Sequence, residues 1–290
     1  MKAIVLFSGG LDSRIACKIM QEQKEVEAIH FILPFAKDNS EELKKFAAKE
    51  KFKLILINLR DGKLFEEYIE MIKHPKHGRG SALNPCRDCH IFMLKKAKEY
   101  ADKHNIQIIA TGEVLGSRPF SQTKLALNLI SKQAGFEILR PLSAKLLAET
   151  SLEKNKLVDR ENLLAIKGRK RTKQIELAKK YNISYPAPGG GCLLCERKYC
   201  DKLAKIINNQ ISFREIKLLS IGRHFNDSKI ILGRNQEENE ILEKEKGIKI
   251  LPDVPAPTAL VYSEDLIEET KLLIQKFSKN KINKFEIILN

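Results

Sequence analysis

Long hydrophobic runs are the first feature that this 290-residue sequence lacks. A helix that spans a membrane needs about 18 or more consecutive apolar residues, and no segment approaches that length. The apolar start, residues 1–7, is also too short for the hydrophobic region of a secretory signal peptide. We therefore expect a cytoplasmic protein that has no membrane partner.

Repeats and low-complexity tracts are absent as well. Hydrophobic residues make up 43% of the chain and charged residues 31%, which is ordinary for globular proteins and excludes disordered, collagen-like and coiled-coil chains. At about 150 residues per domain, the length allows one large domain or two ordinary ones.

Acidic residues are scarce relative to basic ones, because 52 Lys and Arg stand against 37 Asp and Glu, a formal net charge of +15. The excess is spread along the chain rather than confined to a tail. A polyanionic partner would explain it. A basic surface that is merely solvated, as in a lysine-rich or thermophilic proteome, would explain it too, so charge alone does not decide.

Strand-like and helix-like patterns alternate through the first half of the sequence. Continuous apolar runs favour buried strands of a parallel sheet. The expected strands are residues 2–7, 26–32, 54–58 and 106–110. The expected helices are residues 13–23, 40–51, 63–73 and 86–104. This alternation indicates βαβ units and predicts an α/β fold with a doubly wound, mostly parallel sheet.

The second half begins with a break in this pattern. The run Pro-Ala-Pro-Gly-Gly-Gly before Cys192 cannot form a helix or a central strand, so a flexible backbone approaches something there. Short strand-like pieces at 229–232 and 248–251 and a helical pattern at 264–278 follow. We predict a domain at 1–205 and a smaller α+β domain at 206–290.

The sharpest local motif is Ser8–Ser13, with the sequence SGGLDS, between the first expected strand and the first expected helix. Glycines allow a tight turn and bring N–H groups close to an anion, serine hydroxyls add donors, and a helix N-terminus adds partial positive charge. The spacing matches neither the Walker motif nor the dinucleotide-binding glycine motif. The motif therefore predicts a different pyrophosphate-binding loop.

This motif in this position resembles the PP-loop of the N-type ATP pyrophosphatases. The resemblance implies an adenine nucleotide alpha hydrolase-like fold, cleavage of ATP to AMP and pyrophosphate, and adenylation of a carbonyl oxygen. It also implies that the loop holds pyrophosphate and Mg²⁺. By this resemblance and by position at the strand ends, the ATP-binding residues are Ser8, Gly9, Gly10, Leu11, Asp12, Ser13, His30, Phe31, Thr111 and Gly112.

Six cysteines in a cytosolic chain indicate reactive or metal-binding thiols rather than disulfides. Cys17 lies in an apolar helical pattern and is expected to pack in the core. Four others form two CxxC pairs, Cys86 with Cys89 and Cys192 with Cys195. Cys200 has no assigned role.

The positions of these pairs make the chain similar to the tRNA 2-thiouridylases and 4-thiouridine synthetases over about residues 1–205. The resemblance extends to segments 112–122 and 188–194, and it implies sulfur transfer by catalytic Cys86, Cys192 and Cys195. Two departures are evident: each cysteine is doubled into a CxxC, and the RNA-capture extension of the 4-thiouridine synthetases is missing.

The cysteines allow three chemistries. Cys86, Cys89 and Cys192 match the metal ligands of cluster-dependent tRNA thiolases, with a [4Fe-4S] cluster and Cys195 as a fourth ligand or a sulfur carrier. Without a cluster, Cys86 and Cys192 would form a persulfide and disulfide pair in a basic neighbourhood supplied by Arg87 and Arg118. The third alternative is structural zinc.

Two segments suggest RNA contacts. A run ahead of a helical pattern concentrates five cations, which would position RNA by its phosphates or else form a solvated face. These cations are Lys167, Arg169, Lys170, Arg171 and Lys173. In 206–290, Gly233-Arg234-Asn235 with Glu238-Asn239 resembles the RNA-binding module of the NFACT family, which would make this domain a tRNA-docking module.

The combined hypothesis is an ATP-dependent tRNA uridine sulfurtransferase. It would adenylate a uridine carbonyl and replace that oxygen by sulfur, with tRNA and a sulfur donor, a persulfide carrier or sulfide, as partners. The alternatives are a PP-loop ligase that transfers nitrogen to RNA and a non-catalytic RNA-binding protein.

Overall fold

The chain forms two compact units, Met1–Cys195 and Glu196–Asn290, in a computed structural model that describes residues 1–187 and 191–289. Pro188, Gly189 and Gly190, part of the expected loop before Cys192, lie outside the described residues. The division falls before α8 (Arg197–Ile206), earlier than the expected boundary near residue 205. Helix α8 belongs with the second unit, since the Tyr199 hydroxyl donates to the Ile216 carbonyl at 2.9 Å.

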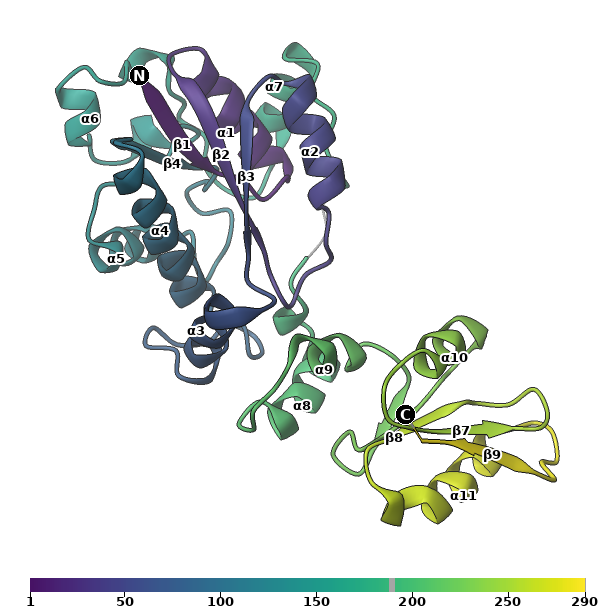
Figure 1. The fold of residues 1–290 in the computed structure, drawn as a ribbon. Coiled ribbons are helices and arrows are strands. Elements are labelled where there is room, and N and C mark those ends of the chain that lie inside the picture. The colour runs from purple at the N-terminus through teal and green to yellow at the C-terminus, as the bar shows by residue number, and fades with distance from the viewer. Residues whose placement is uncertain (188–190, 290) are drawn as a thin grey trace. The chain divides into compact units, whose positions relative to one another are not determined.

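A four-stranded parallel sheet organises the first unit (Figure 1). In spatial order its strands are β3 (Lys53–Asn58), β2 (Glu25–Ile32), β1 (Lys2–Leu6) and β4 (Ile108–Thr111). Figure 1 shows three helices on one face, namely α1 (Leu11–Gln21), α2 (Ser40–Lys49) and α7 (Thr172–Lys180). The other face carries α4 (Cys86–Lys103) and α5 (Lys124–Ala134). The predicted doubly wound, mostly parallel sheet is therefore confirmed.

The strand order places the functional edge of this sheet. The chain moves from β1 outward to β2 and β3, and then crosses to the other side of β1 to form β4. The strand order therefore reverses between the neighbouring strands β1 and β4. Open α/β sheets bind ligands at the carboxyl end of such a strand pair. Both SGGLDS and Thr111–Gly112 lie at this edge.

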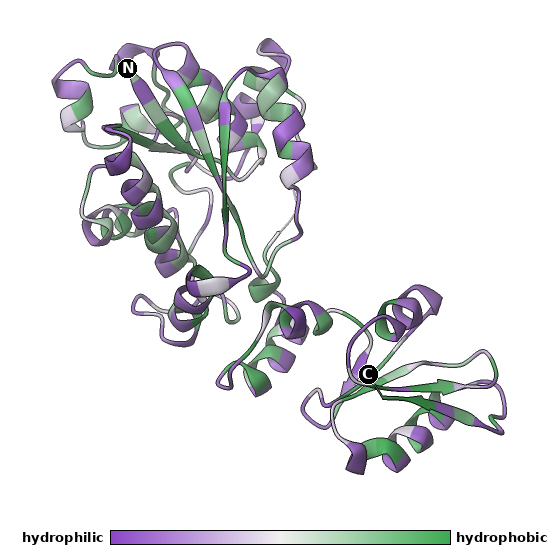
Figure 2. Cartoon of the chain, viewed as in Figure 1, coloured by the Kyte–Doolittle hydropathy of each residue, from purple (hydrophilic) through white to green (hydrophobic). Residues whose placement is uncertain are grey.

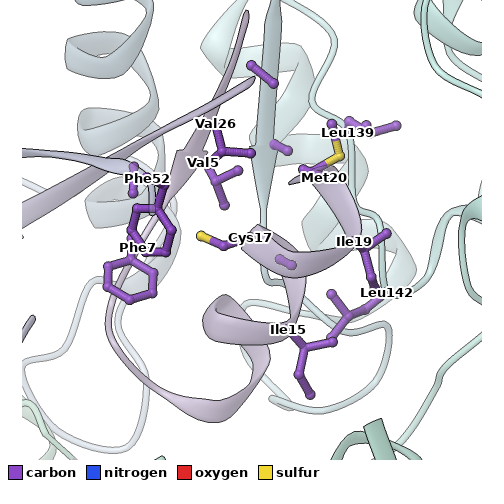
Figure 3. Close-up of a cluster of buried hydrophobic side chains, with 14 of the residues drawn as sticks. Val5, Phe7, Ile15, Cys17, Ile19, Met20, Val26, Phe52, Leu139 and Leu142 are labelled. Carbon is purple, nitrogen blue, oxygen red and sulfur yellow. The ribbon is translucent and has the colours of Figure 1, made fainter. Parts of the chain in front are cut away.

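The core of the first unit explains why the central strands are continuously apolar. Val5 and Ile4 on β1 are fully buried, with helices on both faces. Figure 3 shows Cys17 of α1 among Val5, Val26 and Met20, and its side chain is 0% exposed. The prediction that Cys17 is a packing residue is confirmed.

Amphipathic helices cover the sheet. In Figure 2 the central strands are mainly hydrophobic, whereas the helices carry both hydrophobic and hydrophilic residues. Helix α3 (Gly62–Lys73) precedes α4, and the short α6 (Ser151–Lys154) follows α5. No helix in the described part of the chain is long and apolar enough to cross a membrane.

The second unit has its own antiparallel sheet of five strands. In spatial order they are β5 (Arg223–Phe225), β6 (Ile230–Leu232), β8 (Ala259–Val261), β7 (Ile248–Pro252) and β9 (Phe285–Ile288). Besides α8, its helices are α9 (Phe213–Leu218), α10 (Gln236–Glu243) and α11 (Ile267–Phe277). Ile274 of α11 packs with Ile230 and Ile250 in a separate core. The predicted α+β character of this region is confirmed.

A buried carboxylate, Glu27 on β2, joins three strands and α4. It accepts hydrogen bonds from Lys2 on β1 at 2.7 Å, Tyr100 on α4 at 2.8 Å and Lys53 on β3 at 3.2 Å. Burial alone would raise the pKa of Glu27, but these three hydrogen bonds outweigh burial and lower the pKa to about 2. The ionised form is therefore stabilised by folding.

We predict that Glu27→Gln lowers the free energy of unfolding by about 1–3 kcal/mol at pH 7. Because the folded pKa lies below the unfolded one, the carboxylate's contribution is present above about pH 4.5 and is lost as the pH falls toward 2. Urea unfolding of both proteins at pH 7 and at pH 3 tests this. A difference in stability that does not shrink at pH 3 would contradict it.

Candidate functional site

The SGGLDS segment forms a tight loop from β1 into α1. Gly9 has φ +79°, and a Cβ there would lie 2.3 Å from Leu43 Cδ2, so glycine is required for conformation and space. The Ser13 hydroxyl donates to the Gly10 carbonyl at 2.9 Å and closes the turn. Among the described residues, no side chain caps the start of α1. Its first N–H groups therefore remain available to an anion.

Asp12 supplies an oxygen atom that the described protein leaves unpaired. Its Oδ1 is buried and has no hydrogen-bond partner in the part of the chain that the structure describes. Burial raises the pKa of Asp12, and Arg171, Gln174 and Arg118 oppose that shift. A buried carboxylate oxygen beside a phosphate loop is a suitable Mg²⁺ ligand. The residues present thus fit the metal that the sequence resemblance implies.

The loop after β4 packs directly on the SGGLDS loop. A Cβ on Gly112 would lie 2.7 Å from both the Cα and the N of Ser13, so only glycine allows this backbone contact. Thr111, the preceding residue, is 5% exposed. The sequence predicts that both loops lie at the carboxyl edge of the sheet, and in the structure the two loops contact each other.

Glu113 fixes the β4 loop to α4. It accepts from Arg140 Nε at 2.9 Å and from the Thr111 hydroxyl at 3.0 Å, and it bonds His90 Nδ1 at 2.8 Å. Burial alone would raise the pKa of Glu113, but Arg140 and His90 lower it to about 2. The sequence analysis missed this network, because no local motif marks partners from three separate segments.

Arg14 is the most buried charged side chain near the loop, at 1% exposure. Its guanidinium donates to the Gly9 carbonyl at 2.6 Å, the Ser184 carbonyl at 2.7 Å and the Glu42 carboxylate at 2.6 Å. It therefore ties the SGGLDS loop to α2 and to the segment that leads toward Cys192. Sequence analysis missed this role as well, since a cation on an amphipathic helix normally faces solvent.

Five side chains expected to bind ATP are buried in the structure, among them Leu11, His30 and Phe31. Leu11 and Phe31 are each 6% exposed, and His30 is 8% exposed. His30 Nδ1 bonds the carbonyl of Phe7, which precedes Ser8, at 2.8 Å. His30 thereby supports the start of the loop, and direct contact of these residues with a nucleotide stays a prediction.

The two CxxC segments approach one phenol. The Tyr68 hydroxyl and Cys89 Sγ are hydrogen bonded at 3.3 Å, and Asn84 Nδ2 donates to Cys86 Sγ at 3.3 Å. Burial raises the pKa of Tyr68 most, and Cys89, Cys192 and Cys86 raise it further through their charge. Cys89 therefore contacts Tyr68, a residue that the sequence did not single out, and Cys86 and Cys192 act on the same phenol electrostatically.

The second CxxC segment is anchored beside the chain that follows β2. Cys192 pairs with Ala36 in an isolated antiparallel bridge, and the N–H of Leu193 donates to the Phe35 carbonyl at 2.8 Å. Cys195 is exposed. Cys200 is buried in the second unit.

The cysteines have the right chemistry for a metal, but not the arrangement. No group of three or more His, Cys, Asp or Glu side chains within residues 1–187 and 191–289 is placed to hold a metal ion. We therefore derive no step through an iron–sulfur cluster or zinc.

The expected RNA-binding run lies beside the β4 loop. Leu115 forms a parallel bridge with Lys167, and the N–H of Gly168 donates to the Leu115 carbonyl at 2.7 Å. Four of the five cations, Lys167, Arg169, Lys170 and Lys173, are exposed. The fifth, Arg171, is partly buried and acts electrostatically on Asp12.

Arg87, inside the first CxxC, holds the far end of the same β4 loop. Its Nε donates to the Phe120 carbonyl at 2.9 Å, and its guanidinium lies 4.3 Å from the centre of the Phe120 ring. The start of α4 and the β4 loop are thus joined at Arg87 as well as at His90. This places the first CxxC next to the edge that carries the SGGLDS loop.

The first unit is thus a parallel α/β domain that carries a glycine-containing loop at the carboxyl edge of its sheet, with two CxxC segments in the same unit. The family described as "Thiamine biosynthesis protein (ThiI)" matches residues 1–159, more than half of the chain. The chain belongs to this family. The resemblance to PP-loop enzymes of tRNA thiolation is confirmed for the first unit, whereas the likeness of 206–290 to the NFACT module stays a prediction.

Curated relatives are named "Probable tRNA sulfurtransferase", from Saccharolobus islandicus strains M.16.27 and L.S.2.15 / Lassen #1. Each is 32% identical over 148 residues, which cover 49% of this chain and 36% of the relative. The chain thus spans little more than a third of the length of these relatives.

Two solved structures show weaker likeness. One is a predicted subunit of tRNA methyltransferase from Methanocaldococcus jannaschii, with 20% identity and a TM-score of 0.35, covering 63% of this chain and 90% of that one. The other is phosphoadenylyl-sulfate reductase from Candida auris, with 12% identity and a TM-score of 0.34, covering 63% and 74%.

We predict a marked order of thiol reactivity in the metal-free protein. At pH 8, iodoacetamide should label the exposed Cys195 first and label Cys89 at least about 100-fold more slowly, because burial keeps Cys89 as a thiol. Peptide mass spectrometry after timed quenching measures both rates. In urea the two rates should converge, and equal rates in the folded protein would contradict the buried arrangement.

Proposed function

We propose that this protein uses ATP to thiolate a uridine of tRNA in the cytoplasm. The observation that carries the proposal is the connection between the SGGLDS loop and the cysteines within one unit. Arg14 joins the loop to Ser184 ahead of Cys192, and Gly112 joins it to the β4 loop that Arg87 ties to the first CxxC. The name of the curated relatives supports this chemistry.

The SGGLDS loop would bind and orient ATP. N–H groups at the start of α1 and the Ser8 hydroxyl would hold the phosphates, and the Ser13 hydroxyl would keep the turn closed through the Gly10 carbonyl. Asp12 would hold Mg²⁺ through its unpaired Oδ1. When bound, Mg²⁺ neutralises charge that develops on the phosphates. The uridine carbonyl oxygen attacks the α-phosphorus, and pyrophosphate leaves with the broken P–O bond, which produces an adenylated uridine.

Sulfur transfer then falls to the cysteines around Tyr68. A donor of the persulfide class loads a terminal sulfur onto one cysteine, and that sulfur attacks the activated carbon while AMP leaves with the former carbonyl oxygen. A second cysteine attacks the linking sulfur, so that thiouridine departs and a protein disulfide forms. The electrostatic action of both Cys86 and Cys192 on the Tyr68 phenol supports this pair. An external thiol must reduce the disulfide after each turnover.

Charge supports RNA binding by the first unit. Met1–Cys195 contains 35 Lys and Arg against 22 Asp and Glu, whereas Glu196–Asn290 contains 17 against 15. The basic excess, expected to be spread along the chain, is therefore concentrated in the first unit. The exposed Lys167, Arg169, Lys170 and Lys173 adjoin the β4 loop, so RNA phosphates bound there would be near the proposed chemistry. The second unit, being nearly balanced, would act as an additional docking module rather than the main source of attraction.

The test is reconstitution with unmodified tRNA, Mg-ATP and either a persulfide donor or sulfide, followed by nucleoside mass spectrometry. Wild-type protein should form a thiouridine. Asp12→Asn should reduce the rate by about 10²- to 10³-fold, because it removes the carboxylate that would hold Mg²⁺ against the phosphates. Asp102→Asn, on the exposed surface of α4, is the matched control and should retain activity.

Cysteine variants separate the two half-reactions. With the persulfide donor, Cys86→Ser and Cys192→Ser should abolish thiouridine formation while tRNA-dependent release of AMP or adenylate continues. The proposal fails if neither donor yields a thiouridine with the wild-type protein, or if the double variant thiolates tRNA normally.

A further inference from the structure

The start of α7 faces the start of α1. The two helices pack against each other, and Asp12 in the first turn of α1 interacts with both Arg171 and Gln174. Arg171 is the N-terminal capping position of α7 and Gln174 lies in its first turn. Since both contacts come from the beginning of α7, two helix N-termini, each carrying partial positive charge, lie together at the SGGLDS loop.

Polar groups in this region lack protein partners. Gln174 is 1% exposed, yet its Oε1 has no hydrogen-bond partner among the described residues, and the same holds for Asp12 Oδ1. Arg171, at the N-cap of α7, makes no side-chain capping bond among the described residues, and Gly10, at the N-cap of α1, has no side chain that could make one. Buried polar atoms are normally paired, so these groups indicate a site built around a polar ligand.

A second arginine, the exposed Arg118, lies on the loop after β4, whose Gly112 packs on Ser13 beside Asp12. Like Arg171, Arg118 acts on Asp12. That loop is held at both ends, by Gly112 against Ser13 and by the Gly116 N–H, which donates to the Gln122 carbonyl at 2.7 Å. Two guanidinium groups and two helix N-termini exceed what one carboxylate neutralises, and a polyphosphate has the missing negative charge.

We propose that Arg171 and Arg118 bind the β- and γ-phosphates of ATP across from the SGGLDS loop, while Gln174 orients Asp12. This inference rests on the proposed function. It also assigns the cations of the basic run to two different anions, ATP and RNA. Arg171 turns inward to the nucleotide, and the exposed Lys167, Arg169, Lys170 and Lys173 remain for RNA. The leaving pyrophosphate would stay bound to the same two arginines after adenylation.

The test compares ligands that differ only in their phosphates. Isothermal titration calorimetry with full-length protein measures the Kd values of ATP, pyrophosphate and AMP. Arg171→Ala and Arg118→Ala should each weaken ATP and pyrophosphate by about 10- to 100-fold, the usual effect of losing a charge-assisted hydrogen bond, and change AMP less than about twofold. Lys179→Ala, which removes an exposed cation from the same helix, should leave all three unchanged.

The outcomes separate this inference from the proposed function. If wild-type protein binds ATP and the arginine variants bind it equally well, the inference is wrong and the function stands. If Arg171→Ala weakens tRNA but not ATP, Arg171 is an RNA contact and the inference is also wrong. If wild-type protein binds neither ATP nor pyrophosphate, the proposed function fails. Should an alanine variant unfold, Arg171→Gln and Arg118→Gln carry the same predictions.

Discussion

The buried guanidinium of Arg14 is the interaction on which the candidate site depends. It donates to two backbone carbonyls, Gly9 in the phosphate loop and Ser184 ahead of the second CxxC, and it pairs with Glu42 on α2. Its guanidinium also lies 4.0 Å from the centre of the Phe46 ring. Because a lysine has one donor group and no planar fork, only arginine can satisfy these partners together. One side chain thus ties the phosphate loop to α2 and to the chain ahead of the second CxxC.

The charged side chains of the first unit differ in burial, and their roles differ accordingly. Buried carboxylates with lowered pKa values, Glu27 and Glu113, hold strands, loops and α4 together. Partly buried Arg171 faces Asp12, while its neighbours in the same run face solvent. The cysteines lie in a different environment, since burial raises the pKa of Cys89 and Cys192 and favours their thiol forms. Sulfur loading must therefore change this environment or begin at the exposed Cys195.

The sequence predicts the strands of the first unit well, because segments buried on both faces are continuously apolar. The sequence analysis does not predict α5. Two signals for that helix are nevertheless present, because Thr123 caps its start and Gly135 ends it in the left-handed conformation. Strands β8 and β5 are too short to show a pattern. The SGGLDS loop and cysteine pairs are local motifs and can be recognised. Arg14 with Ser184 and Asp12 with Gln174 are contacts between distant segments, which no local pattern encodes.

Adenylation of the uridine oxygen is the central claim, and isotope transfer tests it most directly. A tRNA transcript is prepared with ¹⁸O in the uridine carbonyls and incubated with the protein, Mg-ATP and a persulfide donor. The account predicts one ¹⁸O in the AMP released for each thiouridine formed, because the oxygen leaves on the α-phosphorus. AMP without ¹⁸O, with thiouridine still formed, would contradict activation of that oxygen by ATP.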